Sequence, residues 1–158
     1  MPDYPQLSTR LVGETESALG ALLAPLLAEA EMTFLQWVVL SLTAPGGASS
    51  PGLDRDQLID RIASIRKVDA ADVAAAIDEL EKAGALVTAG GQVTQTDLGQ
   101  VSFGRVRARV DEITDYVFGL PAEDLAAAGR ILATVTARAN SVLAGVGPSS
   151  AGKSRHLG

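Results

Sequence analysis

Residues 69–95 read DAADVAAAIDELEKAGALVTAGGQVTQ, and this stretch decides the fold. Its first half places Val73, Ile77 and Leu80 at positions i, i+4 and i+7, a spacing that predicts a helix with one narrow buried face. Gly84 follows the last apolar position and ends the helix. The surface left over on this helix is made of alanines and carboxylates.

The second half of the stretch predicts a hairpin. Residues 85–88 and 92–95 alternate like two short strands, and Ala89-Gly90-Gly91 between them supplies glycines that tolerate a positive φ. A helix followed directly by a short hairpin is therefore expected.

On both sides of this stretch, cap residues and apolar periodicity predict further helices. The fold should be mostly helical, because Ala, Leu, Glu and Arg dominate and aromatic residues make up only 4%. The first expected helix spans residues 9–30 and bends at Pro25. The others run from Thr33 to residue 44, from Asp54 over a short stretch, from Asp69 (with Asp72 three residues on) to about Lys82, from Thr96 to about Gly119, and from Pro121 through Leu143. We expect the loop 45–52 to be the least ordered internal stretch.

Composition places the chain among ordinary soluble domains. It has 158 residues, a net charge of −6 and no Cys, which excludes disulfides and thiolate metal sites. The start lacks the basic segment of an export signal, and the apolar stretches 19–30 and 32–44 are shorter than the roughly 20 residues of a membrane span. We therefore expect a cytoplasmic protein of one domain that does not cross a membrane.

No catalytic, metal or cofactor site is expected. The single histidine, His156, lies near the C-terminus, so no Ser-His-Asp triad can be assembled inside the fold. Residues 147–154 match the phosphate-binding pattern G-x-x-x-x-G-K-[ST], but a helical segment precedes them and only four residues follow. We interpret this match as a chance feature of a small-residue tail and expect no nucleotide binding.

Three motifs resemble one family. Residues 32–40, MTFLQWVVL, look like the "LTxxQWxVL" stretch of the MarR-type regulators, and residues 78–87, DELEKAGALV, resemble their "LExxGLV" recognition-helix exit. Residues 96–99, TDLG, are similar to their "LTxxG" start of the fifth helix. The resemblance covers about residues 11–143 and rests on the order and spacing of these motifs.

This resemblance implies a mainly α fold with a small β-hairpin wing, a winged helix-turn-helix flanked by long dimerisation helices. It also implies a homodimer that binds double-stranded DNA and a small lipophilic or aromatic effector. The corresponding regions are an N-terminal dimerisation helix in 1–32, the winged domain in 33–99, C-terminal dimerisation helices in 100–144 and a flexible tail in 145–158.

The expected DNA-reading surface departs from the family pattern. Residues 69–81 contain no Lys, Arg, Asn, Gln, Ser or Thr, and the short wing lacks the Asp-x-Arg signature. Between Asp54 and Gly99 five basic residues face nine acidic ones, a net charge of −4 where a DNA reader normally carries the opposite sign. The expected DNA-binding residues are Arg55, Arg66, Lys67, Ala71, Asp72, Ala75 and Gln92.

The alternative interpretation of these charges is purely structural. Asp72, Asp78 and Glu79 would then be a solvated helix face, and for these residues we favour that interpretation. The basic stretch Arg105, Arg107 and Arg109 would pair with Asp111, Glu112 and Asp115 rather than contact the DNA backbone, and we favour that interpretation.

Aromatic residues point to an effector pocket. The resemblance implies that Phe34, Trp37 and Tyr116 line it, but for Trp37 we favour a plain core role. Two functions remain open: a ligand-responsive DNA-binding regulator, or a winged-helix dimer that has lost DNA reading and serves as an interaction or small-molecule-binding module.

Overall fold

The computed structural model describes residues 5–46 and 53–146 and divides the chain into two compact units, residues 1–113 and 114–158. The expected fold class is confirmed, because helices dominate and the described strands form one antiparallel hairpin. In chain order the elements are α1 (Thr9–Glu29), α2 (Phe34–Thr43), α3 (Arg55–Arg66), α4 (Ala70–Lys82), β1 (Leu86–Ala89), β2 (Gln92–Gln95), α5 (Asp97–Val117) and α6 (Ala122–Leu143).

The helix starts follow the predicted cap residues. Thr33 accepts from the Gln36 N–H at 3.2 Å, and the Gln36 side chain accepts from the Thr33 N–H at 2.9 Å, a reciprocal capping box. Asp54 accepts from the Asp56 N–H at 2.9 Å and so caps α3. Helix α1 runs unbroken through Pro25.

The turn between α3 and α4 corrects one predicted cap. Lys67 takes a left-handed conformation, with φ of 55°, and this reverses the chain after α3. Asp69 is the N-cap of α4, but its side chain makes no capping bond. The N–H of Asp72, which that side chain would have capped, donates instead to the Asp69 backbone carbonyl at 3.1 Å.

The hairpin has a tighter turn than predicted. Ala89 pairs with Gln92, so the turn is Gly90-Gly91 alone, and both glycines have positive φ. Two-residue turns of this kind match the twist of the strands, and this favours the shorter connection. Ala85 is excluded from β1 because its N–H donates to the Leu80 carbonyl and closes α4.

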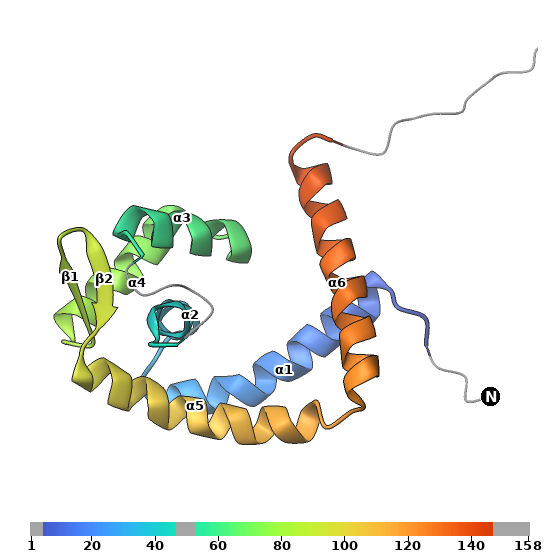
Figure 1. Cartoon of the computed structure of the whole chain (residues 1–158), viewed down its shortest axis with the longest axis horizontal. Coiled ribbons are helices and arrows are strands. Elements are labelled where there is room, and N and C mark those ends of the chain that lie inside the picture. The colour runs from blue at the N-terminus through green and yellow to red at the C-terminus, as the bar shows by residue number, and fades with distance from the viewer. Residues whose placement is uncertain (1–4, 47–52, 147–158) are drawn as a thin grey trace, which may run out of the picture. The chain divides into compact units, whose positions relative to one another are not determined.

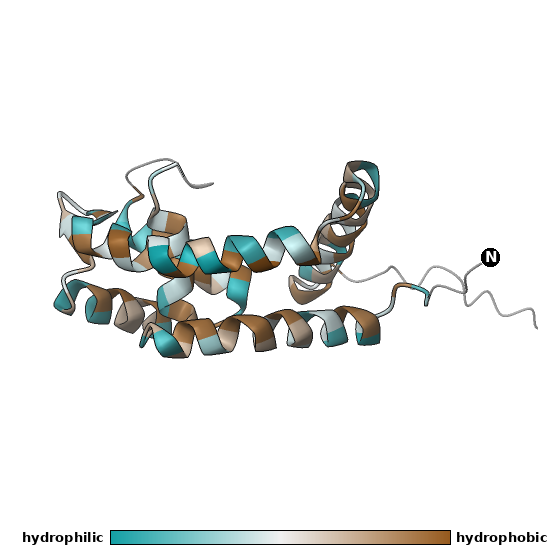
Figure 2. Cartoon of the chain, turned by 90° about the horizontal axis from the view of Figure 1, so that it is seen from below, coloured by the Kyte–Doolittle hydropathy of each residue, from teal (hydrophilic) through white to brown (hydrophobic). Residues whose placement is uncertain are grey.

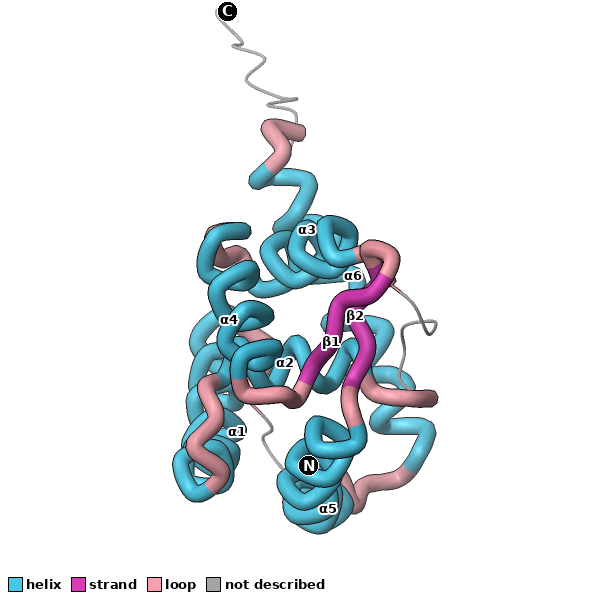
Figure 3. The backbone as a smooth tube through the Cα atoms, turned by 90° about the vertical axis from the view of Figure 1, so that its left-hand side faces the viewer, coloured by secondary structure: helices cyan, strands magenta, loops and turns pink. Residues whose placement is uncertain are grey.

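Helix α2 forms the centre of the first unit, and Figure 1 shows it end-on with α3, α4 and the hairpin on one side and α1 and α5 on the other. Figure 3 shows the two strands lying side by side next to α4 and α2. On α5, Phe103 packs against Trp37 with ring centroids 4.9 Å apart. The largest fully buried side chains are Leu40, Leu58, Ile62, Ile77, Val39 and Val73.

Helix α1 keeps much of its apolar surface exposed, and Figure 2 shows apolar residues recurring along it. Leu22 is 42% exposed, whereas Leu26, one turn further along α1, is buried in the core. Helix α1 has 21 residues and is, by length and composition, long and apolar enough to cross a membrane. The apolar stretch 19–30, which the sequence analysis judged too short for a span, is therefore part of a longer apolar helix. One such helix is weak evidence for a span.

The second unit consists mainly of α6, which begins after Pro121 and has no buried residue. Its exposed apolar side chains include Ile131, Leu132 and Val135. Residues 147–158, which contain the phosphate-loop match, and most of the loop 45–52 lie outside the described residues.

Candidate functional site

Three carboxylates in the second half of α4 have partners on neighbouring elements. Asp78 on α4 accepts from Arg55 Nη2 of α3 at 2.5 Å. Glu79 accepts from Gln36 Nε2 of α2 at 2.9 Å, and Glu81 accepts from the hydroxyl of Thr88 on β1. The second half of α4 is thus hydrogen-bonded to α2, α3 and β1. From the sequence, Asp78 and Glu79 were interpreted only as part of a solvated helix face.

The first half of α4 has exposed side chains that make no contact with neighbouring elements through hydrogen bonds or ion pairs among the described residues. Ala71, Asp72 and Ala75 are all exposed, as expected for a face that approaches a partner, while Val73 and Ala76 turn into the core. Asp72 is the only charged group among the exposed residues of this half. It makes no hydrogen bond through its side chain within the described residues.

The predicted cations lie at the two ends of α3. A helix rises about 1.5 Å per residue, so Arg55 at its start and Arg66 at its end are separated by about 16 Å along the axis. The Arg66 guanidinium lies over the Phe34 ring, 4.5 Å from its centroid, and Lys67 follows in the left-handed C-cap position. Arg66 and Lys67 therefore share one end with the start of α4.

Gln92 lies at the other end, beside Arg55. The wing turns back onto α3, because Gly91 accepts from the Arg55 N–H at 2.9 Å and Gln92 forms a β-bridge with Asp54. The Gln92 side chain is exposed. The structure brings together Arg55 with Gln92, and Arg66 with Lys67, as two separate groups.

A cavity of about 350 Å³ lies between α1 and the start of α2. Its lining consists of Phe34, which the sequence analysis named as a candidate pocket residue, and of Gly20, Leu23, Ala24, Leu27, Ala28 and Met32. Trp37 lies instead in the core against Phe103, and Tyr116 is 88% exposed in the second unit. Phe34 thus lines the cavity and also contacts Arg66.

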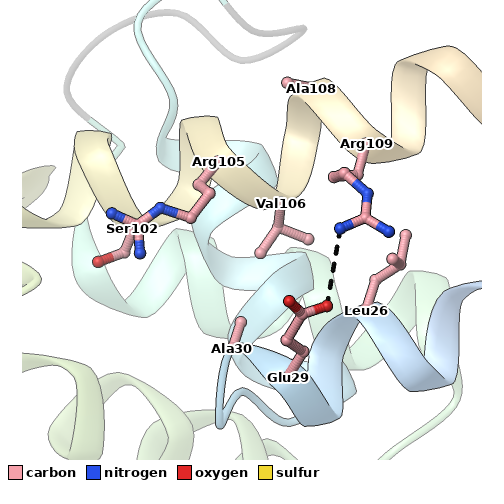
Figure 4. A pocket seen from close by; sticks show the side chains of 8 residues that line it. All are labelled: Leu26, Glu29, Ala30, Ser102, Arg105, Val106, Ala108 and Arg109. Carbon is pink, nitrogen blue, oxygen red and sulfur yellow. Dashed lines mark ion pairs between the residues drawn. The ribbon is translucent and has the colours of Figure 1, made fainter.

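A second cavity, of about 360 Å³, separates the end of α1 from α5 and is seen from close by in Figure 4. Sequence reasoning missed it. Figure 4 shows Arg109 of α5 and Glu29 of α1 pointing toward each other, with Nη1 and Oε2 3.7 Å apart. Its lining is Leu26, Glu29, Ala30, Ser102, Arg105, Val106, Ala108 and Arg109.

The predicted pairing along α5 is confirmed only for Arg107, whose Nε lies 2.6 Å from Asp111 Oδ1. Arg105 has Arg109 four residues ahead, a like charge, so helical spacing offers it no carboxylate there. Arg109 reaches across to Glu29 instead of its own helix.

Gln95 was also missed from the sequence. It is 9% exposed, and its Nε2 donates to the carbonyl of Leu40 at 2.6 Å, near the end of α2. Its Oε1 is buried with no hydrogen-bond partner among the described residues. A polar residue in a short strand gives no signal that it will cap a helix 55 positions away.

Within residues 5–46 and 53–146, no group of three or more His, Cys, Asp or Glu side chains is arranged to hold a metal ion. The polar clusters described above contain carboxylates, amides and arginines. The described residues offer a winged surface and the cavities beside α1.

No protein-family model matches the sequence, and no curated protein is significantly similar to it. Solved structures do match. Ligand-free NadR is 22% identical, with a TM-score of 0.68 over 86% of this chain and 98% of that one. CouR from Rhodococcus jostii RHA1, bound to p-coumaroyl-CoA, is 19% identical, with a TM-score of 0.65 over 79% of this chain and 88% of that one.

The Mycobacterium tuberculosis MarR family protein Rv2887, in complex with p-aminosalicylic acid, is 20% identical, with a TM-score of 0.62 over 83% of this chain and 99% of that one. The match extends over nearly the whole length of the solved chain, so it includes the long helices as well as the winged part. The chain has the MarR-type winged helix-turn-helix fold.

Proposed function

We propose that this chain is a cytoplasmic, homodimeric transcription regulator that binds double-stranded DNA and responds to a small lipophilic or aromatic effector. The observation that carries the proposal is the fold itself, which matches ligand-free NadR with a TM-score of 0.68 over 98% of that chain. Fold alone does not define function, so the site residues carry the rest of the argument.

In the proposed complex, the first half of α4 faces the major groove. Ala71 and Ala75 offer methyl groups for apolar contact with bases, and Asp72 offers an acceptor for a cytosine amine. Arg66 and Lys67 bind phosphates next to the start of α4. At the opposite end of α3, Arg55 and Gln92 supply a second contact; Arg55 does so in competition with Asp78.

The effector is proposed to bind in the cavity between α1 and α2. CouR and Rv2887 were solved with p-coumaroyl-CoA and p-aminosalicylic acid, and NadR with 4-hydroxyphenylacetate. Here Phe34 contacts both the cavity and Arg66, so a ligand that moves this ring also moves a proposed phosphate contact. Trp37 lies in the adjoining core of the same unit, against Phe103.

Dimerisation is proposed through the helices outside the winged part, in residues 1–32 and 100–144. Helix α6 has no buried residue and exposes Leu132 and Val135, and α1 exposes Leu22. Two long helices with free apolar faces exceed what a monomer of this size normally leaves in water.

The test is selection of bound sequences from a random duplex pool, followed by fluorescence anisotropy on the enriched duplex. Replacing Arg66 and Lys67 together by Ala should weaken binding to all duplexes alike, because phosphate contacts position rather than specify. The matched control is Arg10→Ala on α1, which removes an exposed arginine that pairs with Glu14. Equal binding by the double variant and the control contradicts the proposed surface.

One observation favours a second function, an interaction or small-molecule-binding module without DNA reading. The Arg55–Asp78 ion pair occupies one of the few cations on the winged surface, and that surface carries a net charge of −4 between Asp54 and Gly99. If no duplex is enriched from the pool while the protein is dimeric and binds an aromatic ligand, this second function replaces the first.

A further inference from the structure

The first turn of α2 connects the cavity between α1 and α2 to the winged surface. Met32 and Phe34, on either side of the cap residue Thr33, line that cavity. The connection from α1 is short and fixed, because the Met32 N–H donates to the carbonyl of Leu27 at 2.9 Å and Leu27 also lines the cavity. A displacement of this cavity wall is therefore also a displacement of the first turn of α2.

Gln36, in the same turn, uses both ends of its side-chain amide. Its Oε1 accepts from the Thr33 N–H at 2.9 Å, which closes the capping box. Its Nε2 donates to Glu79 Oε2 of α4 at 2.9 Å, between residues 43 positions apart. The residue thus joins the start of α2 to the second half of α4.

An amide is the group that meets both demands at this position. Glutamate serves a capping box as well as glutamine does, and its negative charge is favourable near a helix start. A carboxylate at position 36 has no donor for Glu79, however, and would place two like charges at hydrogen-bond distance. Glutamine satisfies the cap and the α4 carboxylate together.

The other side-chain contacts of α4 come from elements away from this cavity. Asp78 accepts from Arg55 at the start of α3, and Glu81 accepts from Thr88 on β1. Neither Arg55 nor Thr88 lines the cavity between α1 and α2. Among the described side chains that donate to α4 carboxylates, Gln36 is the one that lies in the cavity-lining turn.

We propose that Gln36 is a positioning residue for α4, and that through it a displacement of the first turn of α2 reaches the helix that faces DNA. The inference rests on the proposed function, in which α4 enters the major groove and the cavity between α1 and α2 holds the effector. It gives the effector a route to α4 that is separate from the Phe34–Arg66 contact at the end of α3. When the bond is broken, α4 keeps its buried apolar face, but its second half is held less tightly.

The test is hydrogen exchange of the full chain, with the amides of α4 compared with those of α3 so that changes in overall stability cancel. Gln36→Glu keeps the capping box, removes the donor and repels Glu79. Exchange in residues 78–82 should become roughly fivefold faster relative to α3, as expected for the loss of one hydrogen bond. The double variant Gln36→Glu/Glu79→Gln restores the bond with donor and acceptor exchanged, and its exchange should return to within about twofold of wild type.

Gln57→Glu is the matched control. It makes the same change at the same cap position of α3, the third residue after the N-cap Asp54, and the Gln57 side chain makes no hydrogen bond to α4 among the described residues. Exchange in α4 should not respond to it.

Thr33→Ala tests the transmission itself. It removes the cap hydroxyl, which accepts from the Gln36 N–H, and so loosens the turn that lines the cavity. Exchange in residues 78–82 should become roughly threefold faster in the wild-type background. It should not change further in the Gln36→Glu background, where the link to α4 is already broken.

DNA binding gives a second readout on a duplex enriched from the random pool. Gln36→Glu should lower the ratio of specific to non-specific affinity by roughly fivefold, because α4 is held less tightly, and the double variant should restore the ratio. Gln57→Glu adds the same negative charge, so it should leave the ratio unchanged.

The proposal is overturned if Gln36→Glu leaves exchange in α4 unchanged, if Gln57→Glu speeds it equally, or if the double variant fails to restore it. It is also overturned if Thr33→Ala acts equally in both backgrounds. If the exchange results hold but no duplex is bound, the regulator proposal fails while Gln36 still positions α4. If a duplex is bound with the same affinity ratio by wild type and Gln36→Glu, the regulator proposal stands and the role of Gln36 in DNA reading fails.

Discussion

Replacement of Gly99 by Ala should be the most damaging small change to the winged part. Gly99 lies in the first turn of α5 and is buried against the backbone that joins α4 to β1. A Cβ atom at this position would overlap the carbonyl oxygen of Ala85 and lie 2.9 Å from its carbonyl carbon. The obstacle is backbone, so α5 and the hairpin would have to move apart.

The magnitude follows from what that movement breaks. Overpacking of this kind costs about 1–3 kcal/mol. The Thr96 N–H donates to the same Ala85 carbonyl at 3.1 Å and the Thr96 hydroxyl donates to the Gly84 carbonyl at 2.6 Å, and each bond contributes about 1 kcal/mol. We expect a loss of about 3 kcal/mol in the free energy of unfolding, or a Tm lower by about 6–12 °C.

Thermal and urea unfolding followed by circular dichroism measure this effect. The matched control is Gly104→Ala on the same helix, where an added Cβ meets nothing within 4 Å. That substitution should raise stability by about 0.5–1 kcal/mol through helix propensity. A Gly99→Ala protein as stable as wild type would refute the close approach of α5 to Ala85.

Four further outcomes are expected. Gln95→Ala should lower the free energy of unfolding by about 2 kcal/mol in urea titration, because it removes the hydrogen bond to the Leu40 carbonyl and leaves a void; an unchanged midpoint contradicts this role. Because Asp78 competes with phosphate for Arg55, the salt dependence should rest mainly on Arg66 and Lys67, and about two phosphate contacts per subunit give a slope of log affinity on log salt near −4, whereas full engagement of Arg55 as a third would give about −5; a slope near −10 would place the DNA-facing surface elsewhere. Light scattering should give twice 16.2 kDa, and a monomer at micromolar concentration contradicts the dimer. Deletion of residues 147–158 should leave folding and dimerisation unchanged, and Mg-ATP should give no binding heat with the intact chain, whereas a one-to-one end point would revive the phosphate-loop interpretation.

The local elements of the fold were predictable because their signals are short-range. The capping box of Thr33 and Gln36 uses two residues three positions apart, and the Gly90-Gly91 turn requires backbone conformations that glycine adopts at little cost. The buried face of α4 follows from helical periodicity. The Asp69 side chain does not cap α4, because the N–H of Asp72 donates to the Asp69 backbone carbonyl instead.

The candidate site was predictable only in part. Sequence located Arg66, Lys67 and the exposed alanines of α4, because these lie at or near a helix boundary that the caps define. It did not reveal that Asp78 holds Arg55 or that Arg66 stacks on Phe34. Both contacts join residues more than 20 positions apart, and which charge meets which partner depends on how the helices cross.

The sequence by itself determined the order of helices and hairpin, the narrow buried face of α4 and the shortage of cations on the reading surface, since periodicity, caps and charge counts are properties of the chain. Only the tertiary structure decided what the polar groups do. In the structure Glu29 pairs with Arg109 across a cavity, and Gln95 donates to the Leu40 carbonyl near the end of α2. Gly99 packs directly against the backbone of Ala85. The physical reason is that these contacts are set by packing between elements distant in sequence, and local patterns carry no information about that packing.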